Sequence, residues 1–531
     1  MDLDLEAIKE DVLEKLKGVD VKALAVYGST VAGYAKKDSD VDLLALCQSF
    51  KEKVRYYYFS GKYSYSLLAS DVKETYEDAE KSALGEFVVG RLLNPYLPIF
   101  GEEELKEVEV RYKKRVILEE TYQLYKEYQD FLYHMNIPLE YFLFSKLKKR
   151  YQIYPPALYS YANTYSKERI ERNLPLTLDG FKRASESLPF LELKDGFVRV
   201  KKGAQIPQPY LVDDLYYLQL ALKQYIFHGM SGKVTPDVVL NELVSKVKRS
   251  RSLKDVNVYL KKPEALLQLD GGAKVLEGTP EKELNAVSVE KIGGLLNPFY
   301  GIKVVESEGK KYVVKSFKGK SEFKWIMLGI AGRPIKPFEM NPVKRMYNEY
   351  LGSLLLGSLG INSQKVVAVS VSKKYLVKEY LDGRSLLDYV KSYQGQEDYN
   401  EIFEEVGKTF AEVHRAGFAL GDSKPENFLV SGEKVFLIDL EQFKENASIE
   451  DMGWDIAEFM YYSFYFLKDQ ELAKPFILSF KKGYGESKEV YSEALEQKYL
   501  LPFLVMLRPD LLNYYRKVLK ESLLSEDHDN A

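Results

Sequence analysis

The carboxyl-terminal half of the sequence contains the polar residues that a phosphoryl transfer requires. Asp422 lies in the run GDSKPEN at 421–427, and Asp439 follows in VFLIDLE. The reaction needs a carboxylate that orients the acceptor hydroxyl, two oxygen ligands for magnesium, and a cation that meets the charge of the transferred group. We assign Asp422 as the catalytic base, Asn427 and Asp439 as the metal ligands, and Lys424 as the cation.

A second group of residues, upstream of these, could hold the nucleotide. Lys315 in KKYVVKSF stands on an expected strand, from which it would reach the α- and β-phosphates. Glu349 lies in KRMYNEYLGSLLL, whose apolar spacing predicts a helix, and it is the expected ion-pair partner of Lys315. The run LVKEYLDG predicts a strand followed by a hinge, which places Glu379 and Leu381 beside the adenine through their backbone groups.

Glycines complete the expected nucleotide site. Gly293 and Gly294 come before the expected strand IKVVES, and Gly301 directly precedes it. Backbone N–H groups at such glycines can approach a phosphate closely, because no side chain stands in the way. The predicted cofactors are therefore ATP and Mg²⁺.

The elements that must position these residues follow a simple order. Strand-like runs (IKVVES, KKYVVKSF, KVVAVSV and KYLVKEY) come first, and mainly helical sequence follows. This order predicts a bilobal domain over 289–523, with a tail at 524–531. The ordered set of Lys, Glu, D-x-K-P-x-N and Asp resembles the protein-kinase-like superfamily, which implies an ATP-dependent phosphotransferase with an alcohol acceptor.

Three departures from that superfamily narrow the resemblance. Gly421 replaces the arginine that often precedes the catalytic Asp, and Asp439-Leu440-Glu441 replaces D-F-G. The interval from Asp439 to Asp455 is short and contains no A-P-E, so the usual peptide-docking segment is not expected. This layout resembles the atypical kinases of the RIO and Bud32 type. Within these it is similar to the archaeal RNA kinases, which phosphorylate a ribose 2′-hydroxyl of tRNA.

The amino-terminal residues contain a second motif. Gly28 and Ser29 end the run VYGS, and Asp40 and Asp42 follow in SDVDLL. Residues i and i+2 of a strand share a face, so the two carboxylates would lie together, as a two-metal nucleotidyl transfer requires. The motif resembles the minimal nucleotidyltransferases of the polymerase-β superfamily.

That resemblance implies a third carboxylate on a later strand. In GKYSYSLLASD the matching place is held by Ser66 or Ser64, and Asp71 is expected to lie beyond the strand. Serine is a weaker metal ligand than a carboxylate. Either the domain transfers a nucleotide, or it is a retired catalytic domain that still binds RNA or nucleotide.

The region between the two motifs is predicted to be mostly helical. We expect the nucleotidyltransferase-like domain at 1–100, a helical and winged-helix-like region at 101–261 with a hairpin in LELKDGFVRV, and a linker at 262–288. The predicted fold class is therefore α+β multidomain, with an amino-terminal mixed sheet and a carboxyl-terminal bilobal domain.

Three basic stretches could hold a phosphate backbone: 111–115, 146–150 and 246–254. The tyrosines within them could stack on bases, which favours RNA, tRNA in particular, as a partner. The competing interpretation of each stretch is a solvated helix face.

Composition excludes several classes of protein. The 531 residues are 46% hydrophobic and 29% charged, with a net charge of −3, which is typical of a globular protein. The one cysteine, Cys47, excludes an internal disulfide, and with four scattered histidines it excludes a zinc cluster of usual spacing. Neither a signal peptide nor a membrane-spanning run is apparent, so we expect a cytoplasmic protein without a membrane partner.

Several functions fit these patterns. The first is an RNA kinase whose amino-terminal half binds the RNA. The alternatives are an atypical protein serine/threonine kinase, a bifunctional kinase and nucleotidyltransferase, and a scaffolding or toxin–antitoxin-like use of the amino-terminal fold. The short interval after Asp439 favours the first over a protein kinase, and Ser66 counts against a bifunctional enzyme. The sequence does not predict the oligomeric state.

Overall fold

The computed structural model describes residues 3–37, 39–153, 157–210, 262–291, 301–318 and 338–524, with 216, 219, 220 and 223. The chain forms two compact units, Met1–Leu269 and Asp270–Ala531. Each unit combines sheets with helices, so the α+β multidomain prediction is confirmed. Among the described residues, no helix is both long and apolar enough to span a membrane.

The first unit begins with a five-stranded sheet of order β3-β4-β2-β1-β5. β2 and β4 are parallel, whereas the other neighbours are antiparallel. β1 to β4 form most of the sheet, and β5 closes one edge. Their bounds are β1 (Asp20–Tyr27), β2 (Val41–Gln48), β3 (Val54–Ser60), β4 (Ser64–Asp71) and β5 (Leu97–Phe100).

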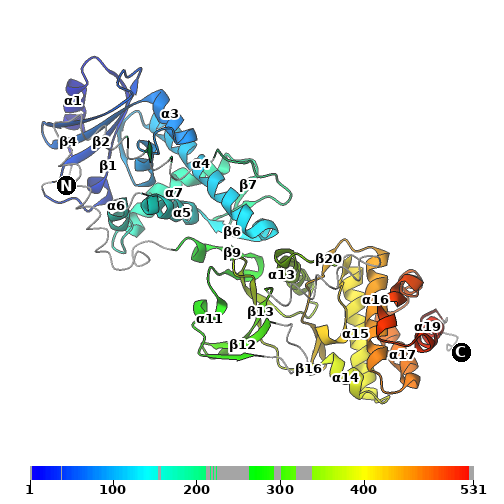
Figure 1. The fold of residues 1–531 in the computed structure, drawn as a ribbon. Helices are drawn as coiled ribbons and strands as arrows, with labels where there is room; N and C mark the ends of the chain where they lie inside the picture. Colours follow the sequence, from blue (N-terminus) through cyan, green and yellow to red (C-terminus); the bar gives the residue numbers. More distant parts are fainter. Residues whose placement is uncertain are drawn as a thin grey trace. The chain divides into compact units, whose positions relative to one another are not determined.

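Helices cover both faces of this sheet (Figure 1). On one face, α1 (Leu5–Lys15) packs Ile8 and Val12 against the apolar side chains of β1, β2 and β4. On the other, α3 (Val72–Lys81) and α4 (Glu102–Tyr128) contact β2, β4 and β1. Asp71 is the last residue of β4, not beyond the strand as predicted, and it caps α3, because its carboxylate accepts the N–H of Lys73 at 2.9 Å.

The rest of the first unit is a helical region with a small sheet. β6 pairs with β8 on one side and with β9 on the other, and β7 and β8 form the predicted hairpin. Asp195 and Gly196 have φ values of 51° and 81°, as a two-residue type I′ turn requires. The elements are α2 (Ser29–Ala32), η1 (Val89–Leu93), η2 (Gln129–His134), β6 (Met135–Pro138), α5 (Leu139–Ile153), α6 (Ala157–Thr164), α7 (Ile170–Glu186), β7 (Leu191–Lys194), β8 (Phe197–Val200), η3 (Glu264–Leu266) and β9 (Gln268–Leu269).

The second unit starts with a sheet of order β11-β12-β13-β15-β14-β10. Residues 262–288, predicted to be a linker, contribute to it, because β10 pairs with β14 in parallel. A two-residue strand is too short to produce a periodic pattern, which is why the sequence suggested a linker. The elements are η4 (Asp270–Gly272), β10 (Lys274–Val275), α11 (Pro280–Glu283), β11 (Ser288–Lys291), β12 (Gly301–Ser307), β13 (Lys310–Ser316), α13 (Pro342–Ser358), β14 (Val366–Ser370) and β15 (Tyr375–Glu379).

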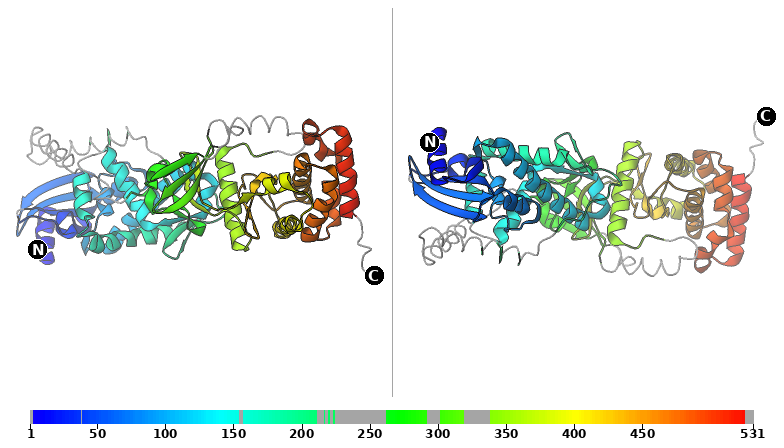
Figure 2. Two further views of the ribbon diagram at one scale, coloured as in Figure 1. Left: turned by 90° about the horizontal axis from the view of Figure 1, so that it is seen from below. Right: turned by 90° about the horizontal axis from the view of Figure 1, so that it is seen from above.

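The remainder of this unit is mainly helical around one large apolar core. Figure 2 shows the strands β11 to β13 (green) on one side of the unit and helices α15 to α19 (yellow to red) on the other. The elements are β16 (Arg384–Ser385), α14 (Leu386–Ser392), α15 (Glu397–Arg415), β17 (Phe418–Ala419), η5 (Pro425–Asn427), β18 (Phe428–Ser431), β19 (Lys434–Leu437), β20 (Lys444–Glu445), α16 (Ile449–Phe466), η6 (Gln470–Leu472), α17 (Ala473–Tyr484), α18 (Lys488–Ala494), η7 (Gln497–Val505) and α19 (Pro509–Leu524).

Candidate active site

Lys315 lies at the centre of a buried group of carboxylates. Its Nζ is 2.8 Å from Glu349 Oε2, 2.9 Å from Asp439 Oδ2 and 2.7 Å from Glu441 Oε1. β13 supplies the lysine, α13 supplies Glu349, and the segment after β19 supplies the other two. Burial alone would lower the pKa of Lys315, but the three carboxylates outweigh it and hold that pKa well above its usual value. The ammonium therefore stays charged, as a phosphate ligand must.

Lys378 and Arg345 extend this group, and neither residue was predicted from the sequence. Lys378 Nζ lies 2.5 Å from Glu349 Oε1 and donates to the Ile438 carbonyl at 2.7 Å. Arg345 binds the Glu441 carboxylate through Nε at 2.6 Å and also through Nη2. Three cations and three carboxylates thus connect helix α13, two strands and the segment that carries Asp439.

The pKa values of Asp439 and Glu441 are shifted in opposite directions. Burial alone would raise the pKa of Asp439, but the Lys315 ammonium outweighs it and lowers the pKa below its usual value. For Glu441, burial dominates and raises the pKa. Of these two carboxylates, Asp439 is therefore the better suited to remain ionised as a metal ligand.

The run 421–427 forms a second cluster next to the first. Lys424 Nζ lies 2.5 Å from Asp422 Oδ1, and Asn427 Nδ2 donates to the Asp422 carbonyl at 2.8 Å. The N–H of Ile438 donates to the Asn427 carbonyl at 3.0 Å, so this run is tied to the segment that carries Asp439. The structure brings together Lys315, Glu349, Asp422, Lys424, Asn427 and Asp439.

Helix α16 fixes the backbone of the run 421–427. Asp455 accepts the N–H groups of Leu420 at 2.6 Å and Gly421 at 2.8 Å. Gly421 has a φ of 76°, and a Cβ atom there would overlap the Gln442 carbonyl. The glycine is thus a steric requirement of this turn, which gives a physical reason for the departure from arginine.

Glu458, one turn further along α16, also supports the run. It accepts the N–H of Ser423 at 2.8 Å and lies 3.7 Å from Lys424 Nζ. Burial raises the pKa of Glu458 to about 8. Burial would lower the pKa of Lys424, but Asp422 and Glu458 hold it well above its usual value. Lys424 is therefore a fixed cation beside the predicted base.

The donor set fits a magnesium ion. Magnesium takes hard oxygen ligands, usually one or two carboxylates together with substrate phosphates. Glu349, Asp439 and Glu441 offer carboxylate oxygens that lie within 4.8 Å of one another, and Asn427 offers an amide. Asp439 and Asn427 are the residues that would hold the ion, because Glu349 and Glu441 are each engaged by two cations.

Of the residues predicted to contact the adenine or the phosphates through their backbone, the structure describes Glu379, Leu381 and Gly301. Glu379 ends β15, where its carbonyl accepts the Gln364 side-chain amide at 2.7 Å, so one acceptor position of that carbonyl is taken. Leu381 is half-buried just beyond. Gly293 and Gly294 lie outside the described residues, and Gly301 begins β12.

A cavity of about 560 Å³ adjoins the catalytic run on the side of Gly421. Its wall includes Glu339, Glu450 and Asp451 together with Lys444, which is itself paired with Asp451 at 2.6 Å. The fixed charge of this cavity is therefore acidic, which is unfavourable for a phosphate backbone.

The residues of the amino-terminal motif lie where β1 ends and β2 begins. Asp42 lies opposite Tyr27 on β1 and beside Ser66 on β4, so Ser66 occupies the place of the third carboxylate. Gly28 has a φ of 76° and begins the turn into α2, whose first residue is Ser29, and a Cβ atom at this glycine would overlap Asp42 Oδ2. Asp40 precedes β2 by one residue and is exposed.

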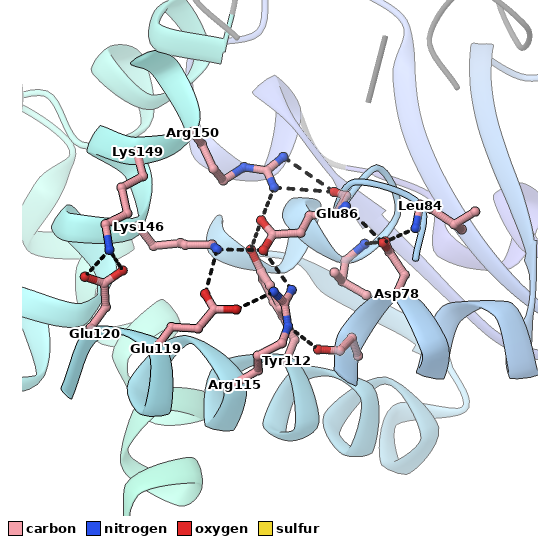
Figure 3. A network of polar contacts seen from close by, with 12 residues as sticks. Asp78, Leu84, Glu86, Tyr112, Arg115, Glu119, Glu120, Lys146, Lys149 and Arg150 are labelled. Carbon is pink, nitrogen blue, oxygen red and sulfur yellow. Dashed lines mark hydrogen bonds and ion pairs between the residues drawn. The ribbon is translucent and has the colours of Figure 1, made fainter. Parts of the chain in front are cut away.

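The basic stretches 111–115 and 146–150 have a structural role, contrary to the RNA-binding prediction. Figure 3 shows Arg115, Lys146 and Arg150 converging on the buried Glu86. Their shortest distances to its carboxylate are 2.7, 2.6 and 2.5 Å. The error arose because sequence spacing does not reveal that a distant glutamate neutralises the charges. The third stretch, 246–254, lies outside the described residues.

Other basic side chains of these stretches are also paired. Lys113 binds Glu109 at 2.6 Å, Lys149 binds Glu120 at 2.7 Å, and Arg111 binds Glu80 and Glu107 at 2.5 and 2.8 Å. Neither stretch is a solvated face as a whole, since Lys113, Arg115 and Lys146 are buried.

Comparison with known families places a nucleotidyltransferase domain at the amino terminus. The family model described as "Nucleotidyltransferase domain" matches residues 5–134. This range contains the whole first sheet and the motif of Gly28, Ser29, Asp40 and Asp42. The resemblance found from those residues is confirmed at this level.

Two curated proteins are similar to parts of the chain. A "probable bifunctional tRNA threonylcarbamoyladenosine biosynthesis protein" of Thermoplasma acidophilum is 25% identical over 240 residues, which are 43% of this chain and 44% of that protein. A "probable serine/threonine-protein kinase BUD32 homolog" of Archaeoglobus fulgidus is 27% identical over 90 residues, 17% of this chain and 42% of that protein. The chain spans less than half the length of each, and the similarity supports a kinase-like domain.

Two solved structures align with parts of the chain. "WaaP in complex with acyl carrier protein" aligns at 16% identity and a TM-score of 0.26, covering 46% of this chain and 93% of that one. A choline/ethanolamine kinase family protein from Mesorhizobium loti aligns at 16% identity and a TM-score of 0.27, covering 44% and 88%. Scores at this level do not establish a shared fold.

Proposed function

We propose that the second unit is an ATP- and magnesium-dependent kinase that transfers the γ-phosphate to a hydroxyl group. The observation that carries this proposal is the contact of Lys315 with Glu349 and Asp439, adjacent to the cluster of Asp422, Lys424 and Asn427. These are the parts that phosphoryl transfer needs, and they come from four separate sequence segments.

Each residue has a role in this proposal. Lys315, held by Glu349, contacts the α- and β-phosphates. Asp439 and Asn427 hold magnesium, which when bound neutralises charge on the β- and γ-phosphates. Asp422 accepts the proton of the acceptor hydroxyl, and Lys424 faces the charge on the transferred phosphoryl group.

The acceptor that we propose is a ribose 2′-hydroxyl of tRNA. The short segment between Asp439 and Asp455 leaves little chain for the docking of an extended peptide, and it is occupied by β20 and the capped start of α16. The Thermoplasma relative, named as a tRNA threonylcarbamoyladenosine biosynthesis protein, supports a connection with tRNA. The basic stretches at 111–115 and 146–150 do not contribute to this proposal, because their charges are paired.

A protein serine or threonine hydroxyl is the second candidate acceptor. The acidic wall of the cavity beside Gly421 favours a basic partner over a nucleic acid. The Archaeoglobus relative, named as a serine/threonine-protein kinase, supports this alternative. A bifunctional enzyme, with transfer by the nucleotidyltransferase domain as well, is the third candidate.

The acceptor is tested by following the label of γ-labelled ATP. The full chain is incubated with deacylated tRNA and, separately, with tRNA-free protein extract, and Asp422→Asn serves as the inactive control. We expect the tRNA to become labelled. Phosphatase treatment should remove this label, and free phosphate should not exchange with it. Label found in protein alone would remove the RNA proposal and establish the second candidate.

A further inference from the structure

Lys315 is surrounded by as many carboxylates as it has hydrogen-bond donors. An ammonium group has three N–H donors. Three carboxylate oxygens, of Glu349, Asp439 and Glu441, lie 2.7 to 2.9 Å from its Nζ. A nucleotide phosphate can therefore contact Lys315 only if one of these carboxylates gives up its place.

Two of the three carboxylates are needed where they are. Glu349 is the ion-pair partner that positions Lys315, and Lys378 Nζ fixes it from another side at 2.5 Å. Asp439 is the proposed ligand of the magnesium ion that bridges the phosphates. The proposed function gives Glu441 no such role, and in the run 439–441 this residue stands in the place of the glycine of D-F-G. Glu441 is therefore the carboxylate that can leave.

A second cation lies ready for the Glu441 carboxylate. Its Oε1 contacts Lys315, whereas its Oε2 accepts a hydrogen bond from Arg345 Nε at 2.6 Å and also binds Arg345 Nη2. A guanidinium can bind both oxygens of one carboxylate in a parallel pair. A rotation of the Glu441 side chain would move Oε1 from Lys315 to Arg345 and leave the glutamate with a counter-charge.

The surroundings confine this movement to the Glu441 side chain. The N–H of Glu441 donates to Asp439 Oδ1 at 3.2 Å, and its carbonyl accepts the Asn348 side-chain amide at 3.2 Å. The Arg345 guanidinium lies over the Phe317 ring at 5.4 Å. Arg345 and Glu441 are only 1% and 4% exposed. Both the backbone of Glu441 and the receiving cation are therefore fixed.

The charge balance favours the exchange when a nucleotide binds. Oxygens of Glu349, Asp439 and Glu441 lie within 4.8 Å of one another, so the three carboxylates repel one another. A triphosphate brings further negative charge to Lys315, and repulsion between charges this close is strong away from water. It is relieved when Glu441 yields its place on Lys315 to a phosphate and keeps Arg345 as its partner.

We propose, given the proposed kinase function, that Glu441 competes with the nucleotide phosphates for Lys315 and that Arg345 receives its carboxylate when ATP binds. Glu441 is then a positioning residue and not a metal ligand. In the empty site it neutralises the buried ammonium, and in the filled site the phosphates take over that task. The competition raises the ATP concentration that is needed to fill the site.

The test is a calorimetric titration of the full chain with ATP, once with Mg²⁺ and once with EDTA. We expect Glu441→Gln to tighten ATP binding by roughly tenfold in both solutions, because its uncharged amide competes poorly for Lys315 whether or not the metal is present. We expect Arg345→Met to weaken ATP binding by a similar factor, because the carboxylate then loses its second cation. Glu433→Gln, in the exposed turn between β18 and β19, is the matched control and should bind ATP as the parent does.

The double variant separates this competition from a general loss of structure. If Arg345 acts through Glu441, Arg345→Met should have little further effect on ATP affinity in the Glu441→Gln background. Equal losses in both backgrounds would contradict the role of Arg345. Glu441→Gln keeps the size of the side chain and an oxygen for Arg345, so it should fold even if Arg345→Met does not. ATP binding by Glu441→Gln that is no tighter than that of the parent would contradict the competition, and weaker binding in Mg²⁺ alone would indicate a metal ligand instead.

The proposed function and the competition can fail separately. A parent chain that transfers phosphate, with a Glu441→Gln variant that binds ATP no more tightly, would contradict the competition alone. A parent chain that binds ATP without transferring phosphate would contradict the proposed function, and the affinities of the variants would still decide the competition. A parent chain that binds no ATP would contradict both.

Discussion

At the scale of single residues, the carboxyl-terminal site depends on ion pairs that share partners. Glu349 is bound by both Lys315 and Lys378, and Glu441 by both Lys315 and Arg345. A buried charge that loses its partner is destabilising, whereas the intact group is neutral as a whole. Removing one cation should therefore affect both stability and the placement of Asp439.

Lys378 offers the clearest test of this arrangement. We expect Lys378→Met to lower the free energy of unfolding by about 3 kcal/mol and to raise the KM for ATP, because Glu349 and the Ile438 carbonyl each lose a donor. Urea unfolding and steady-state kinetics measure the two effects. Lys373→Met, at an exposed position of the preceding turn, should stay within about 0.5 kcal/mol of the parent. Equal effects of the two variants would contradict a positioning role for Lys378.

The raised pKa of Glu458 predicts that the free energy of unfolding depends on pH. Its carboxyl pKa is about 8 in the folded chain and near 4.5 in the unfolded one. Between these pH values the folded state therefore holds a proton that the unfolded state has lost. The stability that this proton contributes should be fully present below about pH 4.5 and lost as the pH rises through about 8. The groups that face Glu458 are Lys424, Asp422, Asp455 and Ser423.

The measurement is the unfolding free energy from pH 5.5 to 9 for the parent and for Glu458→Gln. The parent should lose more stability across this range than the variant, which has no proton to release. Glu489→Gln, an exposed site on α18, should follow the parent curve. Parallel curves for the parent and Glu458→Gln would show that Glu458 does not titrate in this window.

At the scale of elements, local sequence patterns predicted secondary structure better than they predicted tertiary contacts. The strand-like runs of the carboxyl-terminal half correspond to β12 to β15, and the register places Ser66 beside Asp42 as the spacing suggested. The pair of Lys315 and Glu349 was also expected from its place in the chain. These features depend on the period of a strand or a helix, which sequence carries directly.

What could not be predicted depends on contacts between distant segments. In the sequence, Lys378 resembles any other lysine on a strand. Glu441 indicates only that the glycine of D-F-G is replaced. The basic stretches looked like a binding surface, although Glu86 neutralises Arg115, Lys146 and Arg150. The partner of a buried charge is set by the packing of elements, which no local pattern records.

Glu86 should be essential to the packing of α4 and α5. Burial would raise its pKa, but Lys146, Arg115 and Arg150 hold the pKa well below its usual value. We expect Glu86→Gln to lower the free energy of unfolding by about 3–5 kcal/mol at neutral pH, because three buried cations lose their counter-charge. Glu80→Gln, which removes the exposed partner of Arg111, should cost less than about 1 kcal/mol. Thermal and urea unfolding measure both, and a Glu86 effect as small as that of Glu80 would contradict this role.

At the scale of the whole molecule, the chain combines a nucleotidyltransferase domain with a kinase-like unit. The two sites differ in their charge. The carboxyl-terminal site has paired lysines and carboxylates that fit magnesium and phosphate, whereas the amino-terminal site has Ser66 in the place of a third carboxylate beside Asp42. We expect phosphoryl transfer at the carboxyl-terminal site.

The most direct test of the kinase claim is the transfer of phosphate from γ-labelled ATP by the full chain and by Asp422→Asn, with tRNA and protein extract present together as acceptors. The account predicts transfer by the parent chain and by Asp388→Asn, an exposed control on α14. It predicts a loss of roughly 10²- to 10⁴-fold in the rate for Asp422→Asn, in a chain that still unfolds cooperatively. Full activity of Asp422→Asn, or no transfer by the parent chain to either acceptor, would contradict it.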